Sequence, residues 1–157
     1  MSIAVFGINH RSAPLDVIER VALNDERLVK ALDGITSRDT VREAVILSTC
    51  NRTEIYGFAE EPSLLQQTLC SATEGGIEEF QSIAYTFRGE AAIRHLFKVA
   101  TGMDSQILGD YEIVGQMKRA VDIAKQNGFV DMTLGRMVNE AVRATKKVRT
   151  HTEFSSG

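Results

Sequence analysis

The sequence is poor in the residues on which secreted and metal-binding proteins depend. It has two cysteines, Cys50 and Cys70, and three histidines among 157 residues. Two cysteines are too few for the disulfide framework of a small secreted domain, so we expect a reducing, cytoplasmic setting. The Cys, His and carboxylate residues show no zinc-ligand spacing, and we therefore expect no metal.

Long apolar runs and closely spaced glycines are also missing. The first residues, MSIAVFGINH, turn polar before they could form the apolar core of a signal peptide. No apolar run approaches the roughly 20 residues that span a bilayer, so we expect no contact with a membrane. The 12 glycines never form a GxG pair, and the fingerprint of a dinucleotide-binding turn is therefore absent from the sequence.

Positive charge gathers in one segment. The net charge is −3, yet residues 117–149 carry eight Lys or Arg residues against three acids. A basic helical end on an acidic body is typical of a site for a polyanion. A solvated helix face explains the same pattern, and charge alone does not choose between the two.

The chain otherwise alternates between strand and helix patterns. Short apolar runs predict four strands, at residues 3–7, 41–47, 52–59 and 82–87. Apolar residues at helical spacing predict six helices, at about residues 14–22, 24–32, 62–73, 90–102, 111–125 and 133–148.

These elements predict an α+β fold: a small mixed or antiparallel sheet with helices, ferredoxin-like, followed by a packed helical segment. We expect one domain over residues 1–157. Its α/β part takes approximately residues 1–88, its helical part 89–149, and residues 150–157 begin a connection to a further domain.

The stretch ILSTCNRTEIYGF places a cysteine and an arginine between two expected strands. The short gap between these strands predicts an antiparallel hairpin with residues 48–51 at its tip. In that position the sulfur of Cys50 is fixed yet reachable. A cation such as Arg52 beside it raises the thiolate fraction. Because residues i and i+2 of an extended chain point the same way, Arg52 can instead direct its guanidinium at a substrate carboxylate. The alternative is a core cysteine beside a surface ion pair of Arg52 with Glu54.

The segment STCNRTE resembles the signature of the glutamyl-tRNA reductases. Three further blocks resemble that family in the same order: GINHRSAP (Gly7 to Pro14), HLFKVATGMDSQILGDYEIVGQ (His95 to Gln116) and AVRATKKVRT (Ala141 to Thr150). Together they cover essentially the whole chain. The resemblance implies a catalytic N-terminal α/β domain, which the family continues with an NADPH domain and a dimerising helix. The sequence ends at HTEFSSG without these, so we expect a truncated chain.

The resemblance also implies a reaction. The substrate is glutamate esterified to its tRNA, and Cys50 is the nucleophile that displaces the tRNA and holds glutamate as a thioester. Hydride from NADPH then yields glutamate-1-semialdehyde, the first committed intermediate toward tetrapyrroles. The partners that it implies are glutamyl-tRNA, a second copy of the full-length protein, and glutamate-1-semialdehyde aminomutase.

Further site residues follow from the resemblance. Thr49, Arg52, Ser105 and Gln116 match positions with which the family grips the glutamyl group, and a guanidinium suits its side-chain carboxylate. His95 matches a family histidine that either contacts the substrate or acts as an acid or base. A simple structural hydrogen bond on a helix face is the alternative for this histidine.

Several neighbouring residues receive no firm role. His10, in the opening block, shapes either the pocket or only its loop, and Asn51 can be a turn residue that tolerates a left-handed conformation. Asp110 stands where the family commonly has glutamate, and His151 where it more often has an acid, so neither is assigned. Cys70 fits the apolar side of an expected helix.

The implied substrate gives the basic segment a purpose. Arg143, Lys146 and Lys147 become candidate contacts with tRNA phosphates. Two rival interpretations are kept: a module that binds tRNA or a partner enzyme without chemistry, and a cysteine hydrolase that uses Cys50 with His95.

Overall fold

The computed structural model describes residues 1–35, 37, 39–73, 76–104 and 112–156. The elements follow one another along the chain as β1 (Ser2–Asn9), α1 (Leu15–Val21), α2 (Asp25–Asp33), β2 (Val41–Ser48), β3 (Arg52–Ala59), α3 (Pro62–Ala72), α4 (Gly76–Ile83), β4 (Tyr85–Arg88), α5 (Glu90–Ala100), α6 (Glu112–Gln126) and α7 (Met132–Ser156).

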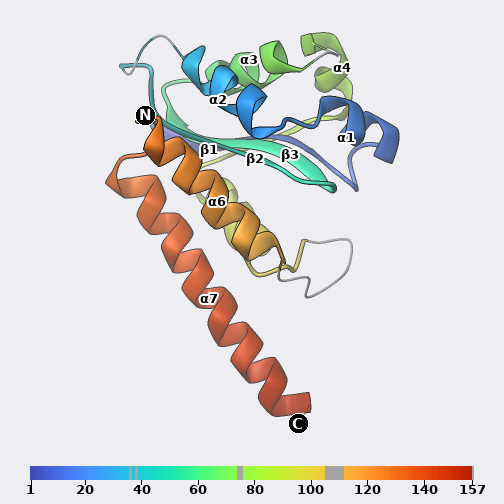
Figure 1. Ribbon diagram of the computed structural model, residues 1–157, viewed down its shortest axis with the longest axis vertical. Helices are drawn as coiled ribbons and strands as arrows, with labels where there is room; N and C mark the ends of the chain where they lie inside the picture. The colour runs from blue at the N-terminus through green and yellow to red at the C-terminus, as the bar shows by residue number, and fades with distance from the viewer. Residues whose placement is uncertain (36, 38, 74–75, 105–111, 157) are drawn as a thin grey trace.

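The four strands form one antiparallel sheet in the order β2-β3-β1-β4. Helices α1 to α4 cover one face of this sheet, and α6 and α7 lie on the other (Figure 1). A β-α-β-β-α-β order with β1 beside β3 and β4 is the ferredoxin-like arrangement. The predicted α+β fold with a small antiparallel sheet and a helical segment is therefore confirmed.

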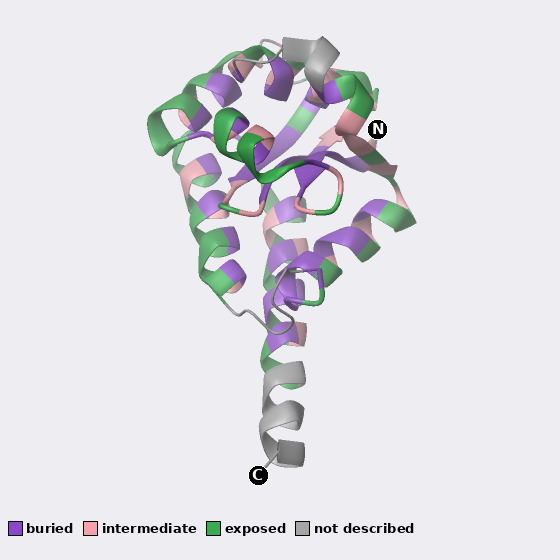
Figure 2. Cartoon of the chain, turned by 90° about the vertical axis from the view of Figure 1, so that its right-hand side faces the viewer, coloured by how far each residue is buried: buried purple, intermediate pink, exposed green. Residues whose placement is uncertain are grey.

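Strands β1, β2 and β3 are buried almost throughout because helices cover both faces of the sheet, whereas the edge strand β4 is partly exposed. In β1 every residue from Ile3 to Asn9 is buried, which is why its sequence is a continuous apolar run and does not alternate. Buried residues form one interior that includes the sheet and the inner sides of the helices (Figure 2).

Several predicted elements differ from the structure, and the last helix, expected at about 133–148, spans Met132–Ser156. The strand expected at 82–87 is β4 at Tyr85–Arg88, because the residues before it belong to α4, a helix that the sequence pattern did not predict. On α1 the buried side chains are Ile18 and Val21, whereas Leu15 at the start of the helix is 61% exposed. The predicted start of α6 at residue 111 lies outside the described residues.

The last helix is anchored to the sheet by a buried acid. Glu43 of β2 is 1% exposed, and its Oε1 accepts hydrogen bonds from the backbone N–H groups of Asp131 (2.8 Å) and Leu134 (3.1 Å). A carboxylate at this position satisfies donors that the first turn of a helix leaves unpaired. From there α7 runs unbroken through residue 150 to Ser156 and away from the sheet (Figure 1).

Candidate active site

Cys50 lies exposed on the tight turn between β2 and β3. The turn is held from three directions: Thr49 N–H donates to the Arg52 carbonyl (2.8 Å), Asn51 N–H donates to Thr49 Oγ1 (3.1 Å), and His10 N–H donates to the Asn51 carbonyl (3.0 Å). No described residue other than glycine has a positive φ, so Asn51 is not in the left-handed conformation. The backbone therefore fixes the position of a thiol that solvent can reach.

Arg52 points away from solvent into the space between the sheet and α5. It is 1% exposed, and its guanidinium donates to the Asp104 carboxylate (3.1 Å), the Asp104 carbonyl (2.7 Å) and Glu54 Oε1 (3.4 Å). Burial alone lowers the pKa of Arg52, but Glu54 and nearby acidic groups raise it above its usual value. Arg52 and Glu54 do form an ion pair, but the alternative that placed this pair on the surface is wrong, because both side chains are buried.

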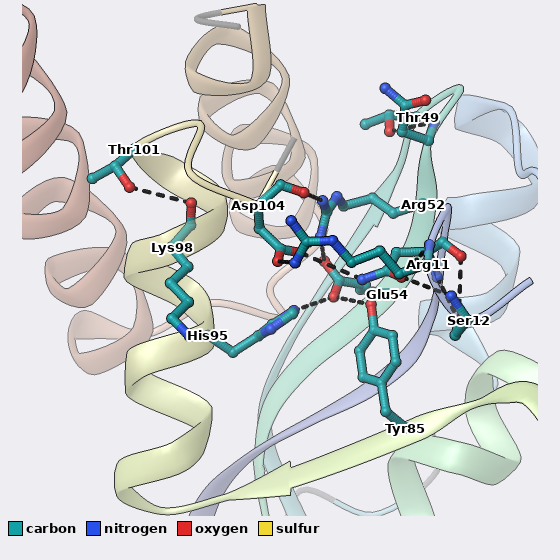
Figure 3. Close-up of polar contacts among 12 residues, drawn as sticks. Arg11, Ser12, Thr49, Arg52, Glu54, Tyr85, His95, Lys98, Thr101 and Asp104 are labelled. Carbon is teal, nitrogen blue, oxygen red and sulfur yellow. Dashed lines mark hydrogen bonds and ion pairs between the residues drawn. The ribbon is translucent and has the colours of Figure 1, made fainter. Parts of the chain in front are cut away.

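Glu54 is the centre of a buried polar cluster. Its carboxylate accepts hydrogen bonds from the hydroxyls of Tyr56 (2.7 Å) and Tyr85 and contacts Nε2 of His95 (Figure 3). Burial raises the pKa of Glu54, but the His95 hydrogen bond and the positive charge of Arg52 outweigh it and lower the pKa to about 2. Glu54 is therefore ionised, which makes it the acceptor in each of these bonds.

Gly7 lets Tyr85 reach this carboxylate. On β1 it lies in register with Glu54 of β3 on one side and with Tyr85 of β4 on the other. A Cβ at Gly7 would come within 2.4 Å of the Thr53 carbonyl oxygen and 2.9 Å of Cγ of Glu54. Gly7 is thus a residue of β1 without a side chain. The strands on its two sides, β3 and β4, are joined across it by the hydrogen bond from Tyr85 to Glu54.

Asp104 joins the end of the α5 segment to the same cluster. Besides Arg52, it binds Arg11 through Oδ1 (2.7 Å) and Asn9 through Oδ2 (3.4 Å). Asn9 also closes its own loop, because its Oδ1 accepts from the backbone N–H groups of Arg11 and Ser12. The loop after β1, the turn after β2 and the end of α5 therefore meet in one place (Figure 3).

His95 of α5 is held firmly within this cluster. It is 8% exposed, its Nε2 is bonded to Glu54, and its ring packs against Phe87 and Tyr85 at centroid distances of 4.9 and 5.3 Å. No hydrogen bond between described residues joins His95 to Cys50. Because His95 Nε2 is already bonded to the buried Glu54 carboxylate, the structure does not favour the Cys50–His95 pair of a cysteine hydrolase.

Two adjoining hollows open beside His95. One of about 330 Å³ lies between the loop after β1 and α5, and one of about 340 Å³ lies along α5 itself. They share Phe87, His95 and Lys98. Arg11 lines the first hollow and Arg94 the second, and each is ion-paired with an acid that lines the same hollow, Asp104 and Glu90 respectively. A larger hollow of about 440 Å³ lies between α2 and α3, across the sheet from the cluster.

The remaining predicted site residues are not brought into the cluster by any described contact. Gln116 is exposed on α6, and Ser105 lies outside the described residues. Arg143, Lys146 and Lys147 are exposed on α7. Their proposed roles stay predictions.

Cys70 is buried in α3 against the apolar core, as its pattern predicted. Burial raises the pKa of its thiol to about 11. A thiol with so high a pKa is almost wholly protonated at neutral pH, so Cys70 is poorly suited to act as a nucleophile.

Glu54, Tyr85 and Asp104 are the residues that sequence reasoning missed. Glu54 was considered only as a surface partner, and the other two were not considered. One signal was present: Arg52 and Glu54 stand two residues apart in an expected strand whose later residues are largely apolar, so both charges lie on one face of a strand suited to the interior. Their partners come from distant segments and leave no local trace.

Within the described part of the chain, no group of three or more His, Cys, Asp or Glu side chains is arranged to hold a metal ion. The same residues include no helix with the length and apolarity required to cross a bilayer.

A ferredoxin-like sheet that presents one anchored, exposed thiol above a buried ionic cluster defines a domain suited to thiol chemistry. Residues 6–152 match the family model described as "Glutamyl-tRNAGlu reductase, N-terminal domain". The chain therefore belongs to the family of glutamyl-tRNA reductase N-terminal domains.

Relatives with known names agree with this. The chain is 52% identical over 140 residues to "Glutamyl-tRNA reductase 2" of Flavobacterium johnsoniae, with 89% of this chain and 31% of the relative covered. It is 40% identical over 151 residues to "Glutamyl-tRNA reductase" of Christiangramia forsetii, with coverage of 96% and 36%. The solved glutamyl-tRNA reductase from Methanopyrus kandleri matches with a TM-score of 0.74 and 27% identity, over 95% of this chain and 34% of that one. The chain thus spans about a third of the length of these proteins.

Proposed function

We propose that this chain carries out the acyl-transfer half of glutamyl-tRNA reduction, with Cys50 as the nucleophile. The observation that carries the proposal is the exposed thiol on a turn whose backbone is held from three directions. Fixing a nucleophile in this way prepays the entropy of bringing it to a substrate. The family match supplies the substrate, glutamate esterified to its tRNA.

The transfer is a simple exchange of bonds. The Cys50 sulfur bonds to the glutamyl carbonyl carbon, the bond from that carbon to the ribose oxygen breaks, and the thiol proton ends on the ribose hydroxyl that departs with the tRNA. The product is a glutamyl thioester on Cys50. A thioester is more readily reduced than the oxygen ester, and the acyl group stays tethered to the protein.

Thr49, Arg52, Ser105 and Gln116 are proposed to bind the glutamyl group. The Thr49 hydroxyl accepts a bond from Asn51 N–H, which leaves its own O–H free to donate. Arg52 already has acceptors in Asp104 and Glu54, so contact with a substrate carboxylate requires that one of these bonds be exchanged. Such an exchange would favour glutamate over an uncharged side chain.

No residue of this chain is proposed to bind NADPH. In the family, that cofactor supplies the hydride which reduces the thioester to glutamate-1-semialdehyde. The sequence contains no GxG turn, and β1 leads into a loop closed by Asn9 and Ser12. We propose that the chain by itself forms the thioester and slowly loses it to water. The homodimer, the aminomutase partner and the cytoplasmic setting are proposed for the full-length protein on the family match alone.

A turnover assay with labelled glutamyl-tRNA tests this proposal. We expect the purified chain to release free glutamate faster than the spontaneous rate, and Cys50→Ser to abolish the excess. With NADPH added, no glutamate-1-semialdehyde is expected in an aldehyde trap. Cys70→Ser is the matched control and should release glutamate like the unchanged chain, because its sulfur is buried away from the site. Semialdehyde formed by the chain alone would contradict the proposal.

The second candidate is a module that binds tRNA without chemistry. One observation favours it: both Arg52 and His95 are engaged with Glu54 in the interior, so neither is open to a substrate as it stands. This candidate predicts binding of glutamyl-tRNA with no glutamate release above the spontaneous rate.

A further inference from the structure

Acyl transfer from a ribose ester needs a group that handles a proton beside Cys50. An unperturbed thiol, with a pKa of about 8.5, is only a few per cent thiolate at neutral pH. The departing ribose oxygen is a strongly basic leaving group that must be protonated as it leaves. A neutral imidazole can take the thiol proton and return it to that oxygen.

His95 is poorly placed for this task. Its Nε2 is committed to the ionised Glu54, and its ring is enclosed by Phe87 and Tyr85. To serve Cys50 it would have to leave a charged acceptor in the interior, which is costly for the carboxylate left behind. Its contacts describe a residue that positions Glu54 and, through it, Arg52.

The loop that carries His10 is joined directly to the turn that carries the nucleophile. Its N–H binds the carbonyl of Asn51, the residue that follows Cys50 (3.0 Å). The loop that carries His10 is fixed by Asn9, whose side chain accepts from Arg11 N–H and Ser12 N–H. These bonds use backbone and neighbouring side chains, so the imidazole of His10 is not needed to hold the loop.

The imidazole of His10 also lacks a partner. Its Nδ1 is the one buried side-chain nitrogen or oxygen in the described part of the chain that makes no hydrogen bond. A buried polar atom without a partner is unfavourable, and in native proteins it calls for an explanation such as a catalytic role. The Cys50 thiol, on the adjoining turn, also makes no hydrogen bond to a described residue.

The charges around His10 keep it neutral. Burial lowers the pKa of His10, and the guanidinium groups of Arg52 and Arg11 lower it further, against an opposing effect of Asp104. The imidazole is therefore in the form that accepts a proton. Transient protonation beside two arginines is unfavourable, which favours prompt return of the proton to the leaving oxygen.

We propose that His10, and not His95, is the acid–base partner of Cys50. This inference rests on the function proposed above. As sulfur attacks, the proton of the thiol passes to the His10 imidazole, the carbon–sulfur bond forms and the ester carbon–oxygen bond breaks. The same proton then passes from His10 to the ribose oxygen, so His10 ends neutral and the tRNA leaves with its hydroxyl restored.

Two esters with different leaving groups test the assignment. The variants are His10→Asn and His10→Ala, each compared with the unchanged chain for its rate of Cys50 acylation. With glutamyl-tRNA at neutral pH we expect about a 100-fold loss, the lower end of what a general acid–base contributes. With 4-nitrophenyl acetate at a pH above the thiol pKa, the thiol ionises unaided and the leaving group needs no proton. Both variants should then react within about threefold of the unchanged chain.

Added imidazole provides the second arm. It should restore part of the glutamyl-tRNA rate to His10→Ala, in which the ring has been removed, and leave the unchanged chain unaffected. An equal loss with both esters, or no rescue, would assign His10 a structural role and overturn the inference. Unchanged rates in both variants would overturn it too, while leaving the Cys50 proposal intact. Failure of the unchanged chain to acylate at all would instead remove the proposed function and this inference with it.

Discussion

At the scale of single residues, the site depends on a glycine. Gly7 separates the strand that carries Glu54 from the strand that carries Tyr85, and the hydroxyl of Tyr85 reaches the carboxylate across it. The backbone of β3 stands so close to Gly7 that a side chain there would displace either the strand or Glu54.

Gly7→Ala should therefore destabilise the chain severely. A Cβ at 2.4 Å from the Thr53 carbonyl and 2.7 Å from Cα of Glu54 meets backbone that cannot yield, and we expect a loss of about 3 kcal/mol or more in unfolding free energy. The matched control is Gly115→Ala in α6, where a new Cβ meets nothing within 4 Å and should stabilise by about 0.5–1 kcal/mol. Urea unfolding measures the change in unfolding free energy of both variants. Equal changes would contradict the close approach of β3 to Gly7.

Glu54 should make stability depend on acid. Its pKa is lowered in the folded chain to about 2 from an ordinary 4.5, so its contribution is full above about pH 4.5 and is lost as the pH falls toward 2. The contribution is of the order of 3 kcal/mol. We expect the gap in unfolding free energy between the unchanged chain and Glu54→Gln to narrow over this window in urea titrations. A gap that stays constant with pH would show that Glu54 is not the titrating group.

At the scale of elements, α7 depends on a side chain from the sheet. Glu43 caps it from β2, across 88 residues of sequence. Glu43→Gln should lower the unfolding free energy by about 1–3 kcal/mol, because buried N–H groups lose a charged acceptor. Asn24→Ala removes the exposed cap of α2, which accepts from Arg27 N–H at 2.9 Å, and should cost only about 1 kcal/mol. Chemical denaturation followed by circular dichroism measures both, and a Glu43 loss no larger than that of Asn24 would contradict burial of the cap.

Most elements could be predicted because their patterns are local. The apolar runs of β1, β2 and β3 are continuous since both faces of the sheet are covered, and the hairpin followed from the short gap between β2 and β3. Helix α4 was missed because glycines precede a short segment that resembles a strand. Because α4 extends to Ile83, β4 begins at Tyr85, three residues after the predicted start of this strand.

The candidate site could be predicted only in part. Cys50 was found because it stands in a recognisable signature at a strand end. The burial of Arg52 was not found, because its compensating partner Asp104 is 52 residues away and nothing near Arg52 in the sequence indicates it. Buried charges are stable only where distant groups pair with them, so local pattern alone does not reveal them.

At the scale of the whole molecule, the arrangement separates a basic helix from an acidic body. Helix α7 carries Arg143, Lys146 and Lys147 on exposed positions and extends away from the sheet (Figure 1). We propose, as part of the function proposed above, that this protruding basic helix contacts phosphates of a tRNA whose aminoacyl end lies at Cys50. The thiol and the helix would then hold two parts of one substrate.

Charge reversal tests this division. The double variant Lys146→Glu, Lys147→Glu should weaken tRNA binding and reduce the slope of log affinity against log salt by about 2, one for each lost phosphate contact. The control, Arg27→Glu with Lys30→Glu, makes the same charge change on α2, across the sheet. A fluorescence binding titration compares the two variants. If both weaken tRNA binding equally, the effect comes from the net charge of the chain and not from a contact between α7 and tRNA.

The most direct test of the account is the covalent intermediate itself. The chain is mixed with glutamyl-tRNA, quenched in acid and examined by intact mass spectrometry, with Cys50→Ser alongside. We predict a single glutamyl adduct that hydroxylamine removes, that maps to Cys50 and that is absent from the variant. Bound tRNA with no adduct, or an adduct that persists in Cys50→Ser, would contradict the assignment of this domain as the acyl-transfer half of the enzyme.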